Sequence, residues 1–251
     1  MDYPSSVLSI NNPIESLYIN HLSPSLPAMM VGVSPKMAAF CISVITPIIF
    51  LFCSVAADPD PLQDVCVADY TSEVKVNGYA CKPTFNEMDF FTDALSKPGP
   101  TNNSLNVVLS SANVLRIPGL NTLGLSLTRI DYAPGGINPP HSHPRATEMV
   151  FVLEGQLDVG FITTSNVLVS KSIKKGEVFV FPKALVHFQM NNGKEPAIGI
   201  NAFNSQFPGS QVLADTLFAS TPTVPNNVLA KAFQVETKEI EKIKYKLAPK
   251  K

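Results

Sequence analysis

The sequence predicts an all-β domain, either a barrel or a sandwich, that ends in a helical tail. From Asn106 onward, short stretches rich in Val, Ile, Leu and Phe alternate with Gly, Pro and Asn, which is the spacing typical of barrels and sandwiches. Residues 226–235 and 237–247 have a helical composition instead. Apolar residues make up 45% of the 251 residues, which is ample for a buried core.

The expected strands are stretches of β-branched and aromatic residues bounded by turn residues. They cover residues 123–132, 148–153, 156–163, 177–181, 187–191 and 197–203. The pairs Glu154-Gly155 and Asn192-Gly193 supply tight turns between them. Residues 149–153 are apolar on both faces of their strand, which we expect when one face lines the interior and the other packs on a second sheet or subunit.

The second expected helix, residues 237–247, carries an apolar stripe. Ile240, Ile243 and Leu247 follow one another at helical spacing, so they share one face of the helix. That face would be buried against a neighbour. We therefore assign residues 216–251 to a C-terminal helical segment and residues 106–215 to the β-barrel.

The charge balance excludes two classes of protein. Nineteen Lys and Arg residues stand against 20 Asp and Glu residues, and no basic block is present, so a nucleic-acid partner is not expected. Only 16% of the residues are charged and 45% are apolar, a composition that excludes an intrinsically disordered chain.

Residues 37–57 are predicted to be a secretory signal peptide. They carry no charge after Lys36 and end in the small residues Val55, Ala56 and Ala57. A membrane-spanning helix is the alternative, but Pro47 interrupts the stretch and no stop-transfer charge cluster follows it. We expect cleavage, a secreted protein that is no longer membrane-bound, and an upstream leader, residues 1–36, with no role in the fold.

Beyond the signal peptide only two cysteines remain, Cys66 and Cys81. An even pair in an oxidising compartment predicts a disulfide, and two buried free thiols are the alternative. A disulfide closing such a loop would stabilise the fold by about 3 kcal/mol in the chain-entropy model. Residues 58–105 are therefore expected to form a disulfide-closed extension, and Asn102, in the triplet Asn-Asn-Ser, is a candidate glycosylation site on an exposed loop.

Three histidines and one glutamate form a candidate metal site. His141 and His143 are two residues apart, so on a strand both imidazoles would point to the same face, and Glu148 opens the next strand. His187 comes from a distant strand. Three nitrogens and one carboxylate suit a first-row divalent ion and can leave coordination positions open for water or substrate. The alternative interpretation is that these four are ordinary polar residues at the mouth of a loop.

Two long motifs resemble those of the plant germins, which belong to the cupin superfamily. Residues 135–148, Gly-Gly-Ile-Asn-Pro-Pro-His-Ser-His-Pro-Arg-Ala-Thr-Glu, resemble the first cupin motif, and residues 176–191, from Gly-Glu-Val-Phe-Val-Phe-Pro to His187 and Asn191, resemble the second. The cysteine pair and the Asn204-Ser205-Gln206 stretch add to the likeness, which covers nearly the whole chain beyond the signal peptide.

The resemblance implies a jelly-roll β-barrel that holds one Mn²⁺ per subunit through His141, His143, Glu148 and His187. It also implies a homohexamer, a trimer of dimers clasped by the C-terminal helices, in the apoplast, where it would serve cell-wall defence and could contact the wall matrix. Copper, iron, nickel or zinc would also suit such ligands.

The same resemblance implies superoxide dismutase activity that produces hydrogen peroxide. Oxalate oxidase activity and a non-enzymatic structural or ligand-binding role are the alternatives. Oxalate-oxidising germins carry an asparagine where this chain has Thr128, whereas their second asparagine is present as Asn138. A threonine hydroxyl offers one donor and an amide offers two, so oxalate turnover is disfavoured.

Two further positions depart from the germin pattern. Ala184 replaces the usual glycine before His187, and this predicts local strain of about 1 kcal/mol if the turn requires a positive φ. Phe207 replaces an asparagine, and the sequence offers no physical account of that change.

Overall fold

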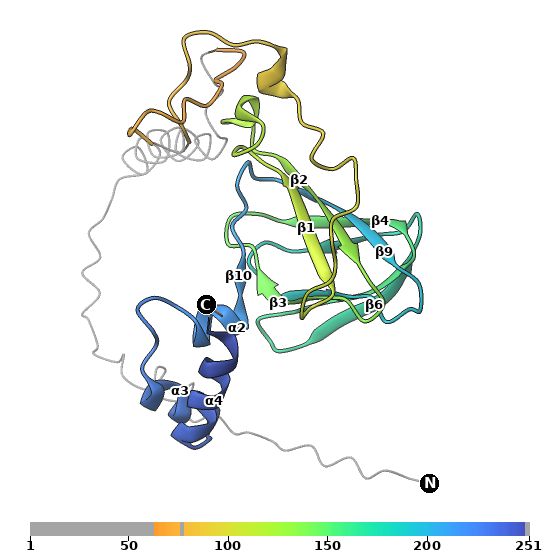
Figure 1. Cartoon of the computed structure of the whole chain (residues 1–251), viewed down its shortest axis with the longest axis vertical. Helices are drawn as coiled ribbons and strands as arrows, with labels where there is room; N and C mark the ends of the chain where they lie inside the picture. Colours follow the sequence, from red (N-terminus) through yellow and green to blue (C-terminus); the bar gives the residue numbers. More distant parts are fainter. Residues whose placement is uncertain (1–62, 76–77, 249–251) are drawn as a thin grey trace, which may run out of the picture. The chain divides into compact units, whose positions relative to one another are not determined.

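Two five-stranded antiparallel sheets form the body of the protein (Figure 1). The structure, a computed structural model, describes residues 63–75 and 78–248, so the predicted leader and signal peptide lie outside the described residues. The first sheet contains, in spatial order, β1 (Val107–Ala112), β2 (Ser126–Tyr132), β9 (Ala197–Phe203), β4 (Glu148–Glu154) and β7 (Val178–Phe181). The second contains β10 (Gln211–Val212), β3 (Ile137–Ser142), β8 (His187–Met190), β5 (Gln156–Ile162) and β6 (Leu168–Lys174).

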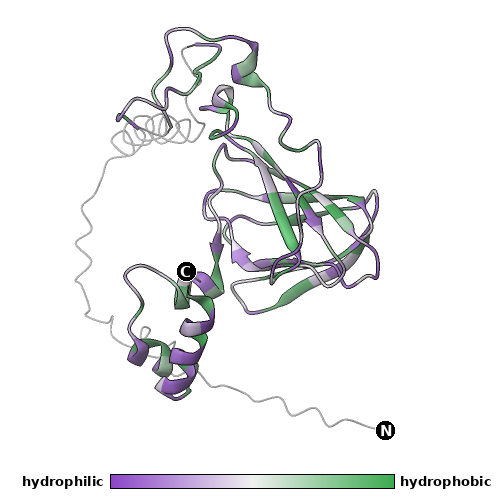
Figure 2. Cartoon of the chain, in the orientation of Figure 1, coloured by the Kyte–Doolittle hydropathy of each residue, from purple (hydrophilic) through white to green (hydrophobic). Residues whose placement is uncertain are grey.

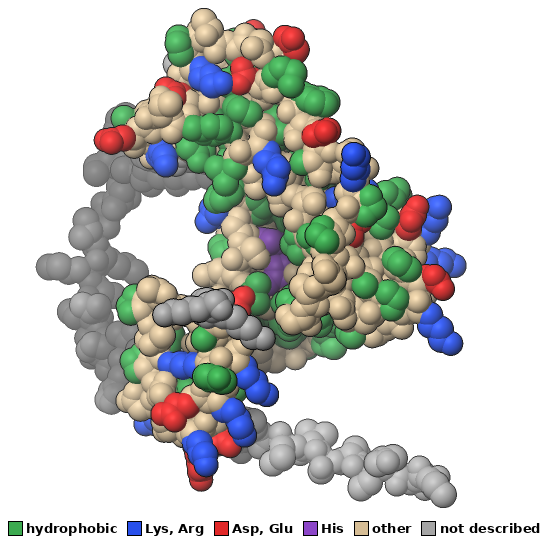
Figure 3. All heavy atoms as spheres, viewed as in Figure 1, with side chains coloured by type: hydrophobic (Ala, Val, Ile, Leu, Met, Phe, Trp, Pro, Cys, Tyr) green, Lys and Arg blue, Asp and Glu red, His purple; other side chains and the backbone are tan. Residues whose placement is uncertain are grey.

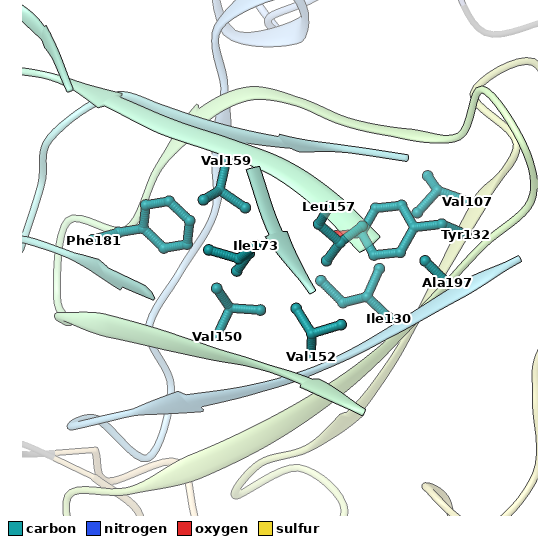
Figure 4. Packing of buried hydrophobic residues seen from close by; sticks show 10 residues of the cluster. All are labelled: Val107, Ile130, Tyr132, Val150, Val152, Leu157, Val159, Ile173, Phe181 and Ala197. Carbon is teal, nitrogen blue, oxygen red and sulfur yellow. The ribbon is translucent and has the colours of Figure 1, made fainter. Parts of the chain in front are cut away.

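Side chains from both sheets meet in one apolar core (Figure 4). Along β4, Val150 and Val152 are fully buried, and they face Leu157 of β5 and Ile173 of β6 across the interior. These are the alternate positions of each strand, as the period of two requires. The predicted all-β barrel is therefore confirmed.

The outer face of β4 stays exposed in the single chain. Met149, Phe151 and Leu153 are 46%, 39% and 38% exposed, and Val178 and Val180 of the neighbouring strand β7 are also exposed. One face of β4 thus lines the barrel as predicted, and within the described residues nothing covers the other.

The strand boundaries differ from the prediction where the backbone turns. The strand expected over residues 123–132 begins only at Ser126, because Thr122 and Gly124 adopt positive φ angles of 69° and 67°, which a strand cannot accommodate. The strands β1, β3, β6 and β10 are not among the expected strands. Of these, β1 and β6 lie at the edges of their sheets, and most of their side chains are only partly buried or exposed, so neither shows the apolar alternation of a central strand. Strand β3 contains two prolines and three polar residues in place of the β-branched and aromatic residues typical of a strand.

Three helices follow the barrel: α2 (Leu213–Phe218), α3 (Asn226–Phe233) and α4 (Thr237–Leu247). The last matches the predicted helix 237–247 in full. The preceding one ends two residues earlier than predicted, because Gln234 adopts the left-handed conformation that terminates a helix. Ile240 is fully buried whereas Ile243 is 38% exposed, so the predicted stripe is only partly covered. Most of the α4 ribbon has the colour of hydrophilic residues in Figure 2.

The segment before β1 is tied to the barrel by covalent and polar contacts. Cys66 and Cys81 form the predicted disulfide, and Ala68 pairs with Cys81 as an isolated bridge. Further along, a short 3-10 helix (Glu87–Phe90) precedes residues that cover the outer face of β2, where Arg129 donates to the Leu95 carbonyl. No helix in the described ranges is long and apolar enough to cross a membrane.

Candidate metal centre

The four predicted ligands converge inside one end of the barrel. One ligand atom from each of His141, His143, Glu148 and His187 lies within 4.8 Å of the others, and all four side chains are buried. His141 comes from β3, Glu148 opens β4 and His187 opens β8. The structure thus brings together every residue that the sequence assigned to the metal site.

The arrangement of the two neighbouring histidines differs in one detail from the expectation. Strand β3 ends at Ser142, so His143 lies one residue beyond it, after an irregularity in the pairing of β3 with β8. The two imidazoles nevertheless pack edge to face with their centroids 4.9 Å apart. The turn at residues 144–147, and not strand alternation alone, places His143 opposite Glu148.

Backbone carbonyls fix the tautomer of all three imidazoles. The Nδ1 of His141 lies 2.7 Å from the Pro139 carbonyl, that of His187 lies 2.8 Å from the Leu185 carbonyl, and that of His143 contacts the Gly209 carbonyl. Because a carbonyl only accepts, each Nδ1 carries the hydrogen and each Nε2 presents a lone pair. Gly209 has a φ of +70°, in the left-handed region that favours glycine.

The Nε2 atoms of His143 and His187 face the carboxylate of Glu148 directly. Oε2 of Glu148 lies 2.9 Å from Nε2 of His143 and 3.0 Å from Nε2 of His187. Lone pairs held this close inside a protein are stabilised by a shared cation, either a metal ion or a proton on Nε2. The donor set therefore fits a divalent metal ion of the first transition row, although nitrogen and oxygen ligands do not distinguish manganese from its neighbours.

The pKa values of the site favour its metal-binding form. Burial, followed by repulsion from His187, lowers the pKa of His141 to about 4, so this imidazole is neutral at physiological pH. Burial alone would raise the pKa of Glu148, but hydrogen bonds from His143 and His187 outweigh burial and lower it.

Two buried amides that sequence analysis did not single out hold the other oxygen of Glu148. Gln189 donates to Oε1 over 2.6 Å, and Asn201 donates to the same atom. The Gln189 carbonyl in turn accepts from the Tyr132 hydroxyl (2.7 Å) and from Asn138 (3.2 Å). Glu148 is thus oriented so that Oε2 alone faces the three imidazoles. Alternation along β8 could have indicated Gln189, since it lies two residues after His187.

In the described part of the chain, the position of Asn201 leaves its buried side-chain oxygen without a hydrogen-bond partner, which costs folding free energy. Its carbonyl oxygen is the buried side-chain polar atom without a hydrogen-bond partner among the described residues. The amide cannot simply flip, because its carbonyl would then face the acceptor-only carboxylate of Glu148. A buried unpaired acceptor costs about 1–3 kcal/mol, and here it accompanies a donor placed on the ligand carboxylate.

A cavity of about 250 Å³ reaches the four-residue site. Its walls include both of the predicted substrate-neighbouring residues, Thr128 and Asn138, and also Asn201 and Phe207. The Thr128 hydroxyl lies 3.1 Å from that of Ser111. Histidine atoms are visible from outside in a hollow of the surface (Figure 3), so small molecules have access to the site.

Phe207, whose departure from the germin pattern had no explanation in the sequence, lines this cavity. The predicted glycosylation site, Asn102, is exposed in the loop before β1, but its modification stays a prediction.

Comparison with known proteins agrees with this geometry. Residues 93–241 match the model of the Cupin family. Germin-like protein 5-1 of Oryza sativa subsp. japonica is 66% identical over 198 residues, which cover 79% of this chain and 90% of that protein. The Rhicadhesin receptor of Pisum sativum is 66% identical over 194 residues, with coverage of 76% and 89%.

A solved structure of recombinant oxalate oxidase in complex with glycolate superimposes with a TM-score of 0.73 at 45% identity. The matched region covers 76% of this chain and 98% of the oxalate oxidase chain. The chain belongs to the germin-like proteins of the cupin superfamily.

Proposed function

We propose that this chain is a secreted, manganese-dependent superoxide dismutase that releases hydrogen peroxide. The observation that carries the proposal is the buried set of three imidazoles and one carboxylate at the end of a small open cavity. A bound manganese ion would supply one-electron redox chemistry, through which two superoxide anions and two protons give one dioxygen and one hydrogen peroxide.

The chain's own residues hold and shape the site. The carbonyl-bound Nδ1 atoms keep each imidazole in the ligating tautomer, and Gln189 and Asn201 keep Glu148 in a single orientation. The cavity is small, and apolar side chains such as Ile130 and Phe203 form part of its wall. It therefore suits a small anion and excludes macromolecular substrates.

Metal analysis coupled to a superoxide assay tests the proposal. The secreted protein should contain manganese and remove superoxide faster than the same concentration of free manganese. The His187→Ala protein should lose both properties, whereas Lys194→Ala, in an exposed turn, should keep them. A manganese-loaded protein with no activity above free manganese would eliminate the proposal and leave a structural or ligand-anchoring role for the metal.

Oxalate oxidation is the second candidate, favoured by the likeness to oxalate oxidase and by Asn138 in the cavity wall. That reaction converts oxalate and dioxygen, with two protons, into two carbon dioxide molecules and hydrogen peroxide. Thr128 lines the cavity but offers one short hydroxyl.

Replacing Thr128 tests this second activity directly. The Thr128→Asn protein should release more peroxide from oxalate than the native protein, by roughly tenfold if one hydrogen bond of about 1.4 kcal/mol is restored. Thr128→Val, which has a similar shape and no donor, is the matched control. Equal rates in all three proteins would remove position 128 as a determinant of oxalate turnover.

The same proposal includes an extracellular location and a homo-oligomer. The Cys66–Cys81 disulfide supports an oxidising compartment. The exposed apolar faces of β4 and β7, with Phe151 and Val180 among them, support burial against further copies, and the germin resemblance suggests six. Light scattering of the purified protein measures the number of subunits.

A further inference from the structure

A second cavity, of about 530 Å³, lies next to the metal cavity but contains none of the four ligand residues. Its wall is formed by residues from separate parts of the chain: Lys75, Gly78, Tyr79, Val114, Thr122, Gly124, Arg145 and residues 204–207. Phe207 lines both cavities, so the two are neighbours separated by the segment that follows β9. No acidic side chain lines this second cavity within the part of the chain that the structure describes.

Two cations converge on this cavity, and neither has an acidic partner among residues 63–75 and 78–248. The Lys75 ammonium lies 5.2 Å from the centre of the Tyr79 ring, and the Arg145 guanidinium lies 5.5 Å from the centre of the Phe207 ring. Nε of Arg145 donates to the Phe207 carbonyl over 2.8 Å, which leaves the two terminal nitrogens available. Aromatic rings thus hold both positive groups in place without neutralising them.

Two side-chain amides present further donors to the same cavity. The Asn204 carbonyl accepts from the Thr147 backbone N–H over 2.8 Å, and the Gln206 carbonyl accepts from the Thr122 backbone N–H. A backbone N–H can only donate, so these contacts fix which end of each amide is the oxygen. The NH₂ groups of Asn204 and Gln206 have no hydrogen-bond acceptor among the described residues.

We propose that this cavity is a binding site for a small organic anion that carries carboxylate or phosphate oxygens. Two unneutralised cations and two free amide NH₂ groups offer only donors, and a ligand rich in acceptor oxygens satisfies them all. Tyr79, Val114 and Phe207 supply apolar contact for the carbon skeleton. The site is independent of the proposed redox activity, since the ligands of the metal lie outside it.

Calorimetric titration of the purified, full-length secreted protein at low ionic strength tests this site. Succinate is the carboxylate probe, inorganic phosphate is the second oxyanion, and succinamide is the uncharged analogue of succinate. We expect saturable binding of at least one oxyanion and none of succinamide. The Lys75→Gln protein should bind about tenfold more weakly, whereas Lys194→Gln, which removes the same charge from an exposed turn elsewhere, should bind as the native protein does.

A metal-site variant separates this cavity from its neighbour. The His187→Ala protein should retain oxyanion binding, because His187 does not line the second cavity. Binding that is lost in His187→Ala and kept in Lys75→Gln would place the anion at the metal and overturn the proposal. The absence of saturable binding of either oxyanion below about 10 mM would overturn it as well. The Arg145→Gln protein should also bind the oxyanion about tenfold more weakly, and if it fails to fold, the Lys75→Gln result still decides.

Discussion

Along the inward face of β4, Glu148 is followed by Val150 and Val152, whereas along β8 His187 is followed by Gln189. Strand β9 runs antiparallel to β4, so its inward-facing residues begin with the apolar Ala197 at the apolar end and reach the polar Asn201 at the metal end. The two ends of one barrel interior are therefore built on the same strands, with most polar side chains at one end, where Phe181 and Phe203 pack on the imidazoles, and mainly apolar side chains at the other.

The two ends stabilise the protein in different ways. At the apolar end, burial removes side chains such as Leu157 and Ile173 from water, and this supplies folding free energy. At the metal end, burial of the polar side chains costs free energy unless each finds a partner. Most of these polar side chains have a hydrogen-bond partner, and the lone pairs of the three imidazoles and Glu148 remain available to bind an ion. Substitutions at the first end should change stability, and those at the second should change metal binding.

The largest effect is expected at the apolar end. Leu157→Ala should lower the free energy of unfolding by about 2–5 kcal/mol, because the side chain is fully buried and its removal leaves a cavity. Urea denaturation measures the change, and metal content per folded chain should stay as in the native protein. Leu168→Ala, at a 54% exposed position on the edge strand β6, is the control, with a change within about 0.5 kcal/mol. A loss of metal in Leu157→Ala would contradict the separation of the two ends.

Acid should destabilise the metal end of the metal-free protein through His141. The pKa of His141 is lowered from 6.5 to about 4 in the folded protein by burial and by His187, so the unfolded chain takes up the proton first as pH falls. The metal-free protein should therefore lose about 3 kcal/mol of stability between pH 6.5 and pH 4. Urea denaturation of chelator-treated protein across this range measures the slope.

The His141→Gln protein provides the control for this slope. A glutamine does not titrate, so the contribution of His141 should disappear. The slope of stability against pH should then correspond to up to one proton fewer taken up on unfolding. An identical pH dependence in both proteins would assign the effect to other groups.

A smaller effect is expected when the support of Glu148 is removed. Gln189→Leu keeps the approximate size of the side chain and deletes the donor to Oε1, so Glu148 loses part of its orientation. Metal affinity should fall about 10- to 100-fold, measured by competition with a chelator. Gln156→Leu, at an exposed position at the start of β5, should leave metal affinity unchanged. Equal affinities in both variants would show that the ligand carboxylate needs no such support.

The contrast between the two ends also explains what could be predicted from the sequence. His141, His143, Glu148 and His187 could be assigned because imidazoles are rare in this chain and the germin motifs surround them. Asn201 could not be assigned, because it reaches Glu148 only through the pairing of β9 with β4. Ordinary amides carry no signal of their own in a sequence, and strand pairing across 53 positions is a property of the fold.

The edge strands and the second cavity could not be predicted from the sequence, for related reasons. In β6 only Ile173 is buried, so its composition resembles that of a loop even though it pairs with β5 along its whole length. Lys75 and Arg145 are 70 positions apart in the chain, and only the folded extension before β1 brings them to one cavity. Local patterns therefore predict central strands and ligand motifs better than they predict surfaces assembled from distant segments.

The smallest predicted effect lies in the turn that leads to His187. Ala184 has a φ of +65°, the left-handed region that glycine adopts without the steric cost of a Cβ atom, as the sequence comparison with germins suggested. The backbone N–H of Ala184 donates to the His143 carbonyl over 3.2 Å, so the folded turn holds this residue in the strained conformation. Ala184→Gly should raise the free energy of unfolding, but by no more than about 1 kcal/mol, since glycine also makes the unfolded chain more flexible.

Ala219→Gly is the matched control for this last substitution. Ala219 follows α2 with a φ of −126°, which alanine adopts without strain, so glycine there should lower the free energy of unfolding by a few tenths of a kcal/mol up to about 1 kcal/mol. The opposite signs of the two changes, measured by urea denaturation, distinguish relief of strain from a general effect of glycine. Metal affinity should be equal in Ala184→Gly and the native protein, because the strain lies in the turn and not in the position of His187. A weaker metal affinity in Ala184→Gly would instead show that the strained turn helps to place that ligand.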